Sequence, residues 1–162
     1  MSSALTRGQV LLAEMEAEVA SSRNCLTRIS EKVFDWKPHP KSMPMGYLAL
    51  LVAEIPLWIA TTVERTEIDF ATFTHFQPKT TAELVSHLDE NVERARRALR
   101  QATDTALSST FHLRNHGKVL FSQPIGESVA PRISISVSAS NAPSRSGGTS
   151  TRSTRFRCTR ST

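Results

Sequence analysis

Two histidines four residues apart, His112 and His116, have the spacing that would place both imidazoles on one face of a helix, where they could bind a metal ion. The turn-forming sequence Asn115-His116-Gly117 argues against a helix at this point. Such a spacing also arises often by chance. We therefore keep His112 and His116 as a weak alternative metal site only, and expect the segment from Thr110 to Phe121 to be a hairpin or an irregular connection.

A single charged residue, Glu54, interrupts the apolar stretch from Met43 to Val63. Burying a carboxyl group is costly unless a partner compensates it. Two roles are open for Glu54: a catalytic acid, or one half of a salt bridge at the edge of a helical bundle. The salt bridge is the simpler interpretation, and Glu54 is kept as the only catalytic candidate.

The remaining histidines and the two cysteines have ordinary structural interpretations. His39 lies between two prolines, and His75 lies in a loop rich in aromatic residues. His87 falls among leucines on an expected helix, where it would be partly buried and hydrogen-bonded. Cys25 and Cys158 fit neither a disulfide framework nor the spacing of a zinc finger.

Three amphipathic segments would position these groups. Apolar residues at intervals of three and four predict a first helix with a stripe from Leu12 to Ile29. A second helix is expected from about Met45 to Glu64, with a kink at Pro56. A third is expected from a capping box at Thr80-Thr-Ala-Glu83 to about Ala102.

Charge is distributed unevenly along the 162 residues, whose net charge is +5 at pH 7. The segment 131–162 holds six arginines and no acid, so the segment 1–130 carries 14 basic against 15 acidic side chains. This balance argues against a nucleic-acid partner. The N-terminus lacks the charged and apolar regions of a signal peptide, which favours a cytoplasmic protein. Glu54 and two prolines favour a buried helix over a membrane span, and no membrane partner is expected.

Three motifs in this order resemble the DinB/YfiT-like superfamily: Asp35–Met43, Val52–Ile59 and Leu113–Phe121. The resemblance covers about residues 8–124. It implies an all-α protein of the up-down four-helix-bundle type, with a divalent metal, commonly zinc or nickel, held by three histidines. One ligand would lie on the second helix and two, in a His-x-x-x-His pattern, on the fourth. The activities implied are those of metal-dependent thiol transferases, isomerases or hydrolases.

This chain departs from the family pattern where the metal would be held. The second-helix ligand position, three residues before Glu54, is Leu51, whose hydrocarbon side chain has no lone pair. No histidine follows His116. We therefore expect an incomplete bundle over residues 1–124 that holds no metal and no other cofactor. Its function would be that of a degenerate family scaffold or, alternatively, of a non-catalytic remnant or interaction protein.

The fourth helix is expected to be missing or degenerate, and the segment 125–162 is expected to be a disordered tail. Residues 131–162 include nine serines, five threonines and six arginines, too few apolar groups to offset the entropy of ordering. Read one base out of frame, residues 141–162 can encode a pattern like the end of a family member, so a frameshifted gene product is our hypothesis. The missing helix would expose an apolar groove lined by Leu51, Ile55 and Leu88, through which the protein could self-associate.

Overall fold

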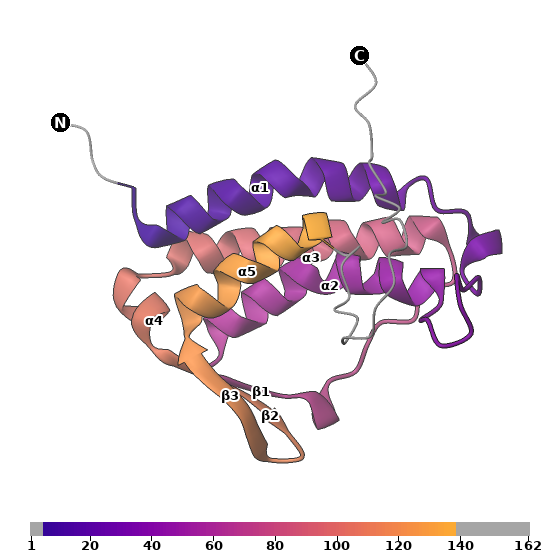
Figure 1. Ribbon diagram of the computed structural model, residues 1–162. Coiled ribbons are helices and arrows are strands. Elements are labelled where there is room, and N and C mark those ends of the chain that lie inside the picture. Colours follow the sequence, from indigo (N-terminus) through magenta and orange to yellow (C-terminus); the bar gives the residue numbers. More distant parts are fainter. Residues whose placement is uncertain (1–4, 139–162) are drawn as a thin grey trace, which may run out of the picture.

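The structure is a computed structural model that describes residues 5–138, with side chains described as far as residue 131. It is mostly helical, with a small three-stranded sheet (Figure 1). The helices are α1 (Arg7–Leu26), α2 (Met45–Glu64), α3 (Thr81–Gln101), the short α4 (Asp104–Ser108) and α5 (Ile125–Ser138). The strands are β1 (Glu67–Asp69), β2 (Thr110–Asn115) and β3 (Lys118–Pro124), and two single 3-10 turns lie at Glu31–Val33 and Phe70–Thr72.

Side-chain caps fix the starts of α1 and α3. At α1, Thr6 and Gln9 form a complete capping box, each side chain accepting from the other's backbone amide. At α3, Thr80 Oγ1 accepts from the amide of Glu83, as the sequence predicts. The carboxylate of Glu83 accepts from the amide of Lys79 and not from that of Thr80, so only the Thr80 half of the predicted capping box is formed.

The four long helices do not alternate in direction. Gly8, near the start of α1, lies against Leu99 near the end of α3, so these two helices run in opposite directions. Glu64 at the end of α2 pairs with Arg94 of α3, while Glu54, earlier in α2, lies beside His87, earlier in α3. Helices α2 and α3 therefore run in the same direction, and the predicted up-down alternation is wrong for this pair.

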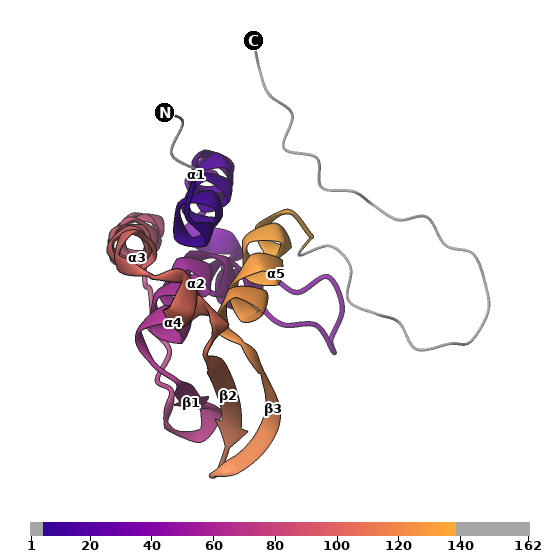
Figure 2. The same ribbon diagram turned by 90° about the vertical axis from the view of Figure 1, so that its left-hand side faces the viewer.

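The length of the connection permits the parallel arrangement of α2 and α3. The 16 residues of 65–80 can span about 50 Å when extended, whereas a 20-residue helix is about 30 Å long. The chain can therefore return along the full length of α2 before α3 begins. Figure 2, seen close to the helix axes, shows α2 between α3 and α5, with α1 and the sheet on opposite sides.

The fourth long helix exists, and the prediction that it is missing is wrong. Helix α5 covers Ile125–Ser138 and packs against α1 and α2 (Figure 1). Ile125 and Val129, one turn apart, are 3% and 0% exposed and seat the helix in the core. Serines between the apolar residues hide this period in the sequence. The expected tail therefore cannot begin at residue 125, and residues 139–162 lie outside the described part of the chain.

The apolar groove expected from a missing helix is largely covered in the structure. Leu88 is 1% exposed, and Leu51 and Ile55 are half-buried. By length and composition α2 could cross a membrane, but in this structure it is the central helix, packed against α3, α5 and α1. Pro56 lies inside α2, which continues beyond it to Glu64.

The segment after α4 is a hairpin, one of the two forms expected from the sequence. Strand β2 pairs antiparallel with β3 and parallel with β1, so β2 is the central strand. His116 and Gly117 form the two-residue turn with φ of 50° and 77°, the left-handed conformation that such hairpins require. Phe111 and Leu113 of β2 point into the core. A bulge leaves Leu120 of β3 without a partner on β2.

Asp69, at the end of β1, holds the tip of the hairpin. Its carboxylate accepts hydrogen bonds from the backbone amides of Ala71, His116 and Gly117, at 2.9, 3.0 and 2.7 Å. The amide of Ala71, followed by those of Gly117 and His116, lowers the pKa of Asp69 below its usual value. The ionised carboxylate thus joins two segments that are separated in the sequence by the whole of α3 and α4.

The contact of Gly8 with α3 predicts a loss of stability in Gly8→Ala. A Cβ at this position would lie 2.6 Å from the backbone oxygen of Leu99, so one of the helices must shift. The free energy of unfolding, measured with urea, is expected to fall by about 1–3 kcal/mol. Ala13→Leu, which adds bulk on the exposed side of α1, is the control and should change it by less than about 0.5 kcal/mol. Equal stability of Gly8→Ala and the wild type would contradict the packing of α1 on α3.

The lowered pKa of Asp69 predicts a pH-dependent contribution to stability. A carboxyl whose folded pKa is lowered stabilises the fold above its unfolded pKa, near 4, and this stabilisation is lost as the pH falls through the folded pKa. The difference in unfolding free energy between wild type and Asp69→Asn should therefore be largest above about pH 4 and shrink below it. Chemical unfolding of both proteins at a series of pH values measures this difference. A difference independent of pH would contradict the role of the carboxylate.

Candidate functional site

Glu54 lies in the core of the protein, with an exposed fraction of 0%. Its Oε2 is 2.5 Å from Nδ1 of His75, and its Oε1 accepts from the backbone amide of Phe76 at 3.2 Å. Nε2 of His87 lies 3.8 Å from Oε1. The expected salt bridge at a bundle edge is therefore corrected: the carboxyl group is internal, it is hydrogen-bonded to the imidazole of His75 and the amide of Phe76, and the imidazole of His87 lies close by.

Three parts of the chain bring this cluster together. Helix α2 carries Glu54, α3 carries His87, and the connection between these helices carries His75 and Phe76. Helices α2 and α3 run in the same direction, and the turn that holds Glu54 lies beside the turn that holds His87. Next to it, the side-chain amide of Asn91 donates to the backbone oxygen of Ala53 at 3.0 Å, which fixes the register of α2 against α3.

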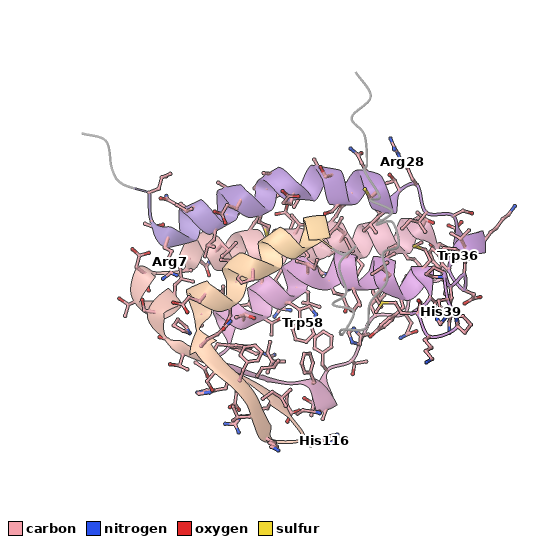
Figure 3. The ribbon with its side chains drawn as sticks, in the orientation of Figure 1. Arg7, Arg28, Trp36, His39, Trp58 and His116 are labelled. Carbon is pink, nitrogen blue, oxygen red and sulfur yellow. The ribbon has the colours of Figure 1, made fainter. Side chains whose placement is uncertain are left out.

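Aromatic rings enclose the cluster on the side of the connection. The ring of Phe76 stacks on His87 with centroids 4.4 Å apart and planes 20° apart. His75 is held edge-on by two rings, with centroid distances of 4.9 Å to Phe73 and 5.8 Å to Tyr47. Phe73 also packs on Trp58, which Figure 3 labels on the side of α2 that faces the connection. These rings exclude water from the carboxyl group and fix the orientation of both imidazoles.

The geometry orients one imidazole as in an acid–base pair. A carboxylate that accepts from Nδ1 holds a histidine in the tautomer that leaves Nε2 as a base. The side chain of His75 is 28% exposed, whereas that of Glu54 is 1% exposed.

A catalytic pair also needs space for a substrate. An apolar cavity of about 20 Å³ between α1 and α2 is lined by residues that include Met15, Val52 and Ile59, and Glu54 and His75 are not part of that lining.

His87 differs from His75 in its hydrogen bonding. Its Nε2 atom is buried and lies beyond hydrogen-bond distance of the carboxylate, without a partner among the described residues. The separation of 3.8 Å from Oε1 places the imidazole next to the carboxyl group but too far away for a hydrogen bond. His87 therefore contributes to the cluster through its position and its stacking on Phe76 rather than through a hydrogen bond.

The residues expected at a metal site are not brought together. Leu51 is half-buried on α2, three residues before Glu54, and offers no donor atom. His112 lies on β2, where its Nδ1 is 2.6 Å from Oγ of Ser122, and His116 lies at the tip of the hairpin (Figure 3). Within residues 5–138, no group of three or more His, Cys, Asp and Glu side chains is arranged to hold a metal ion. Leu51, His112 and His116 therefore do not fit the three-histidine site that the family resemblance implies.

Glu54 could be identified from the sequence, whereas the importance of its partners could not. His75 and His87 are distant from Glu54 along the chain, and each has an ordinary structural interpretation by itself. The only signal in the sequence was the group of aromatic residues around His75. Such a group indicates a packed loop but does not indicate which buried side chain the loop contacts.

Comparisons with known proteins identify no relative of this chain. No family model, no curated protein and no solved structure matches the chain. The structure itself thus defines the class: a mostly helical protein with a small sheet and a buried carboxyl–imidazole cluster.

The cluster predicts that replacing His75 alone lowers the free energy of unfolding more than replacing Glu54 and His75 together. His75→Phe keeps a ring between Phe73 and Tyr47 but removes the nitrogen that faces Glu54. Leaving a buried carboxyl group without this partner should lower the free energy of unfolding by about 1–3 kcal/mol. The double variant Glu54→Leu/His75→Phe should be less destabilised than His75→Phe, because no buried polar group is then left unpaired.

Urea unfolding of the single and double variants measures this coupling. His112→Phe is the matched control, since it removes an imidazole and its contact with Ser122 from the exposed side of the sheet instead of the core. Its effect should be smaller than that of His75→Phe. Equal destabilisation of the single and double variants would show that the carboxyl group does not depend on His75.

Proposed function

We propose that this chain is a DinB-like four-helix scaffold that lacks the metal-dependent activity implied for intact family members. The resemblance of three motifs supports the family. The lateral packing of α1, α2, α3 and α5 supports the scaffold. Leucine at position 51, where the family pattern has a ligand, supports the loss of metal-dependent chemistry.

The use of both carboxylate oxygens of Glu54 within the protein carries this proposal. One oxygen faces His75 and the other accepts from the amide of Phe76. The carboxyl group is thereby engaged in holding the connection between α2 and α3. In this chain Glu54 is an internal anchor and not a catalytic acid.

Zinc or nickel, the metals implied by the resemblance, has no place in this proposal. Most zinc sites in proteins have at least three protein ligands. Leu51 supplies none, and His112 and His116 belong to a hairpin whose strand and turn direct them differently from a helix. No reaction step is therefore assigned to a bound metal.

A partner-binding role is the second candidate, and the exposed apolar side chains favour it. The groove proposed for self-association loses its basis, since α5 is present and Leu88 is buried. The cavity that remains beside Leu88 measures about 20 Å³, room for about one water molecule. The most exposed large apolar side chains lie outside this cavity, and several of them, such as Trp36 and Met43, are on the loop before α2.

The proposal predicts that purified full-length protein holds well under one equivalent of zinc or nickel after dialysis. Elemental analysis measures the metal content. Added zinc should also leave the unfolding midpoint unchanged, because a ligand stabilises a fold only when it binds the native state. One tightly bound equivalent would contradict the proposal, and loss of that metal in His112→Ala/His116→Ala would then assign it to these two residues.

A further inference from the structure

The loop before α2 exposes three large apolar side chains at one end of the molecule. Val33, Trp36 and Met43 are 39%, 51% and 45% exposed, and we refer to these three residues as the apolar tip. Figure 3 shows Trp36 beside the ends of α1 and α2, at the same end of the molecule as Arg28 and His39. Large apolar side chains exposed on a single loop are candidates for a contact site.

The backbone of this loop is held by its own hydrogen bonds. The amide of Trp36 donates to Val33, and the amide of Met45 donates to the oxygen of Trp36 at 2.9 Å. The amide of Gly46 donates to Phe34, so both arms of the loop are joined. The apolar tip is thus presented in a fixed conformation, which reduces the entropy lost on binding.

Positive side chains flank the residues of the apolar tip along the chain. Four exposed cations lie close together along the chain, on either side of Val33 and Trp36: Arg28, Lys32, Lys37 and Lys41. Two acids, Glu31 and Asp35, lie in the same stretch. The carboxylate of Glu31 accepts from the amide of Thr81, which lowers the pKa of Glu31 and directs its charge toward α3. The segment 28–43, which carries the tip, therefore has a net positive charge.

We propose that the apolar tip is a contact site for an anionic lipid surface. Tryptophan is enriched at the boundary between headgroups and hydrocarbon, and lysines beside it are attracted to anionic lipids. A peptide partner would instead require a groove or a free strand edge, whereas this feature is a protruding loop. The contact is peripheral and leaves α2 in the core. It revises the expectation from the sequence that the protein has no membrane partner.

Sedimentation with vesicles of phosphatidylcholine, with and without phosphatidylserine, tests the proposal on the full-length chain. Binding is expected only with phosphatidylserine at low ionic strength, and it should weaken with salt. The Trp36 emission should shift to shorter wavelength on binding. Trp36→Ala, and separately Lys37→Ala/Lys41→Ala, should each lower the partition coefficient about tenfold.

A matched control is available on the hairpin. Leu120, 53% exposed, and Lys118 provide an apolar and a cationic side chain on β3, and Lys118→Ala/Leu120→Ala should bind like the wild type. Circular dichroism verifies that every variant is folded, and Trp36→Ala isolates the emission of Trp58. Failure to bind phosphatidylserine vesicles would overturn the proposal. So would binding that the loop variants retain in full, since it would assign the attraction to other cations, such as the arginines of residues 132–162.

Discussion

The carboxyl group of Glu54 imposes the main constraint on this fold, because a fully buried carboxyl group must be compensated inside the protein. The compensation comes from His75 and Phe76, which lie on the connection and not on a neighbouring helix. The connection must therefore return along α2 to reach Glu54, and α3 must begin where that return ends. The parallel course of α2 and α3, the enclosure of His75 by aromatic rings and the stacking of Phe76 on His87 all follow from this placement.

Local features of the sequence predicted the helices best. The second helix was expected from about Met45 to Glu64 and is found there. Its start follows a proline-rich segment, and its composition is mostly apolar, so both signals are local. The first helix ends at Leu26, before the last member of its predicted stripe, Ile29. Helix α5 was missed because its packing depends on a few side chains, chiefly Ile125 and Val129, within a serine-rich sequence. Composition describes the average polarity of a segment, whereas a helix can pack into the core through the apolar side chains of a single turn.

The candidate site could be predicted only in part, for a similar reason. A lone charge in an apolar helix marks Glu54 in any sequence of this kind, but the groups that face it are set by the direction of α3 and the path of the connection. Neither is encoded in a local pattern. The lack of a donor atom at position 51 differs from these cases, because the identity of that residue alone decides it. Chemistry that depends on one residue type can be read from sequence, and chemistry that depends on long-range pairing cannot.

The bulge at Leu120 affects how the protein behaves toward other copies of itself. Strand β3 lies at the edge of the sheet, with consecutive apolar residues Val119, Leu120 and Phe121 exposed to solvent. A straight edge of this composition would serve as a template for intermolecular strand addition and hence for aggregation. The unpaired residue bends and twists the strand and interrupts its regular spacing of amide and carbonyl groups. Lys118 and Pro124 at its two ends further limit the length over which another strand could align, so the hairpin retains an apolar edge with a reduced tendency to polymerise.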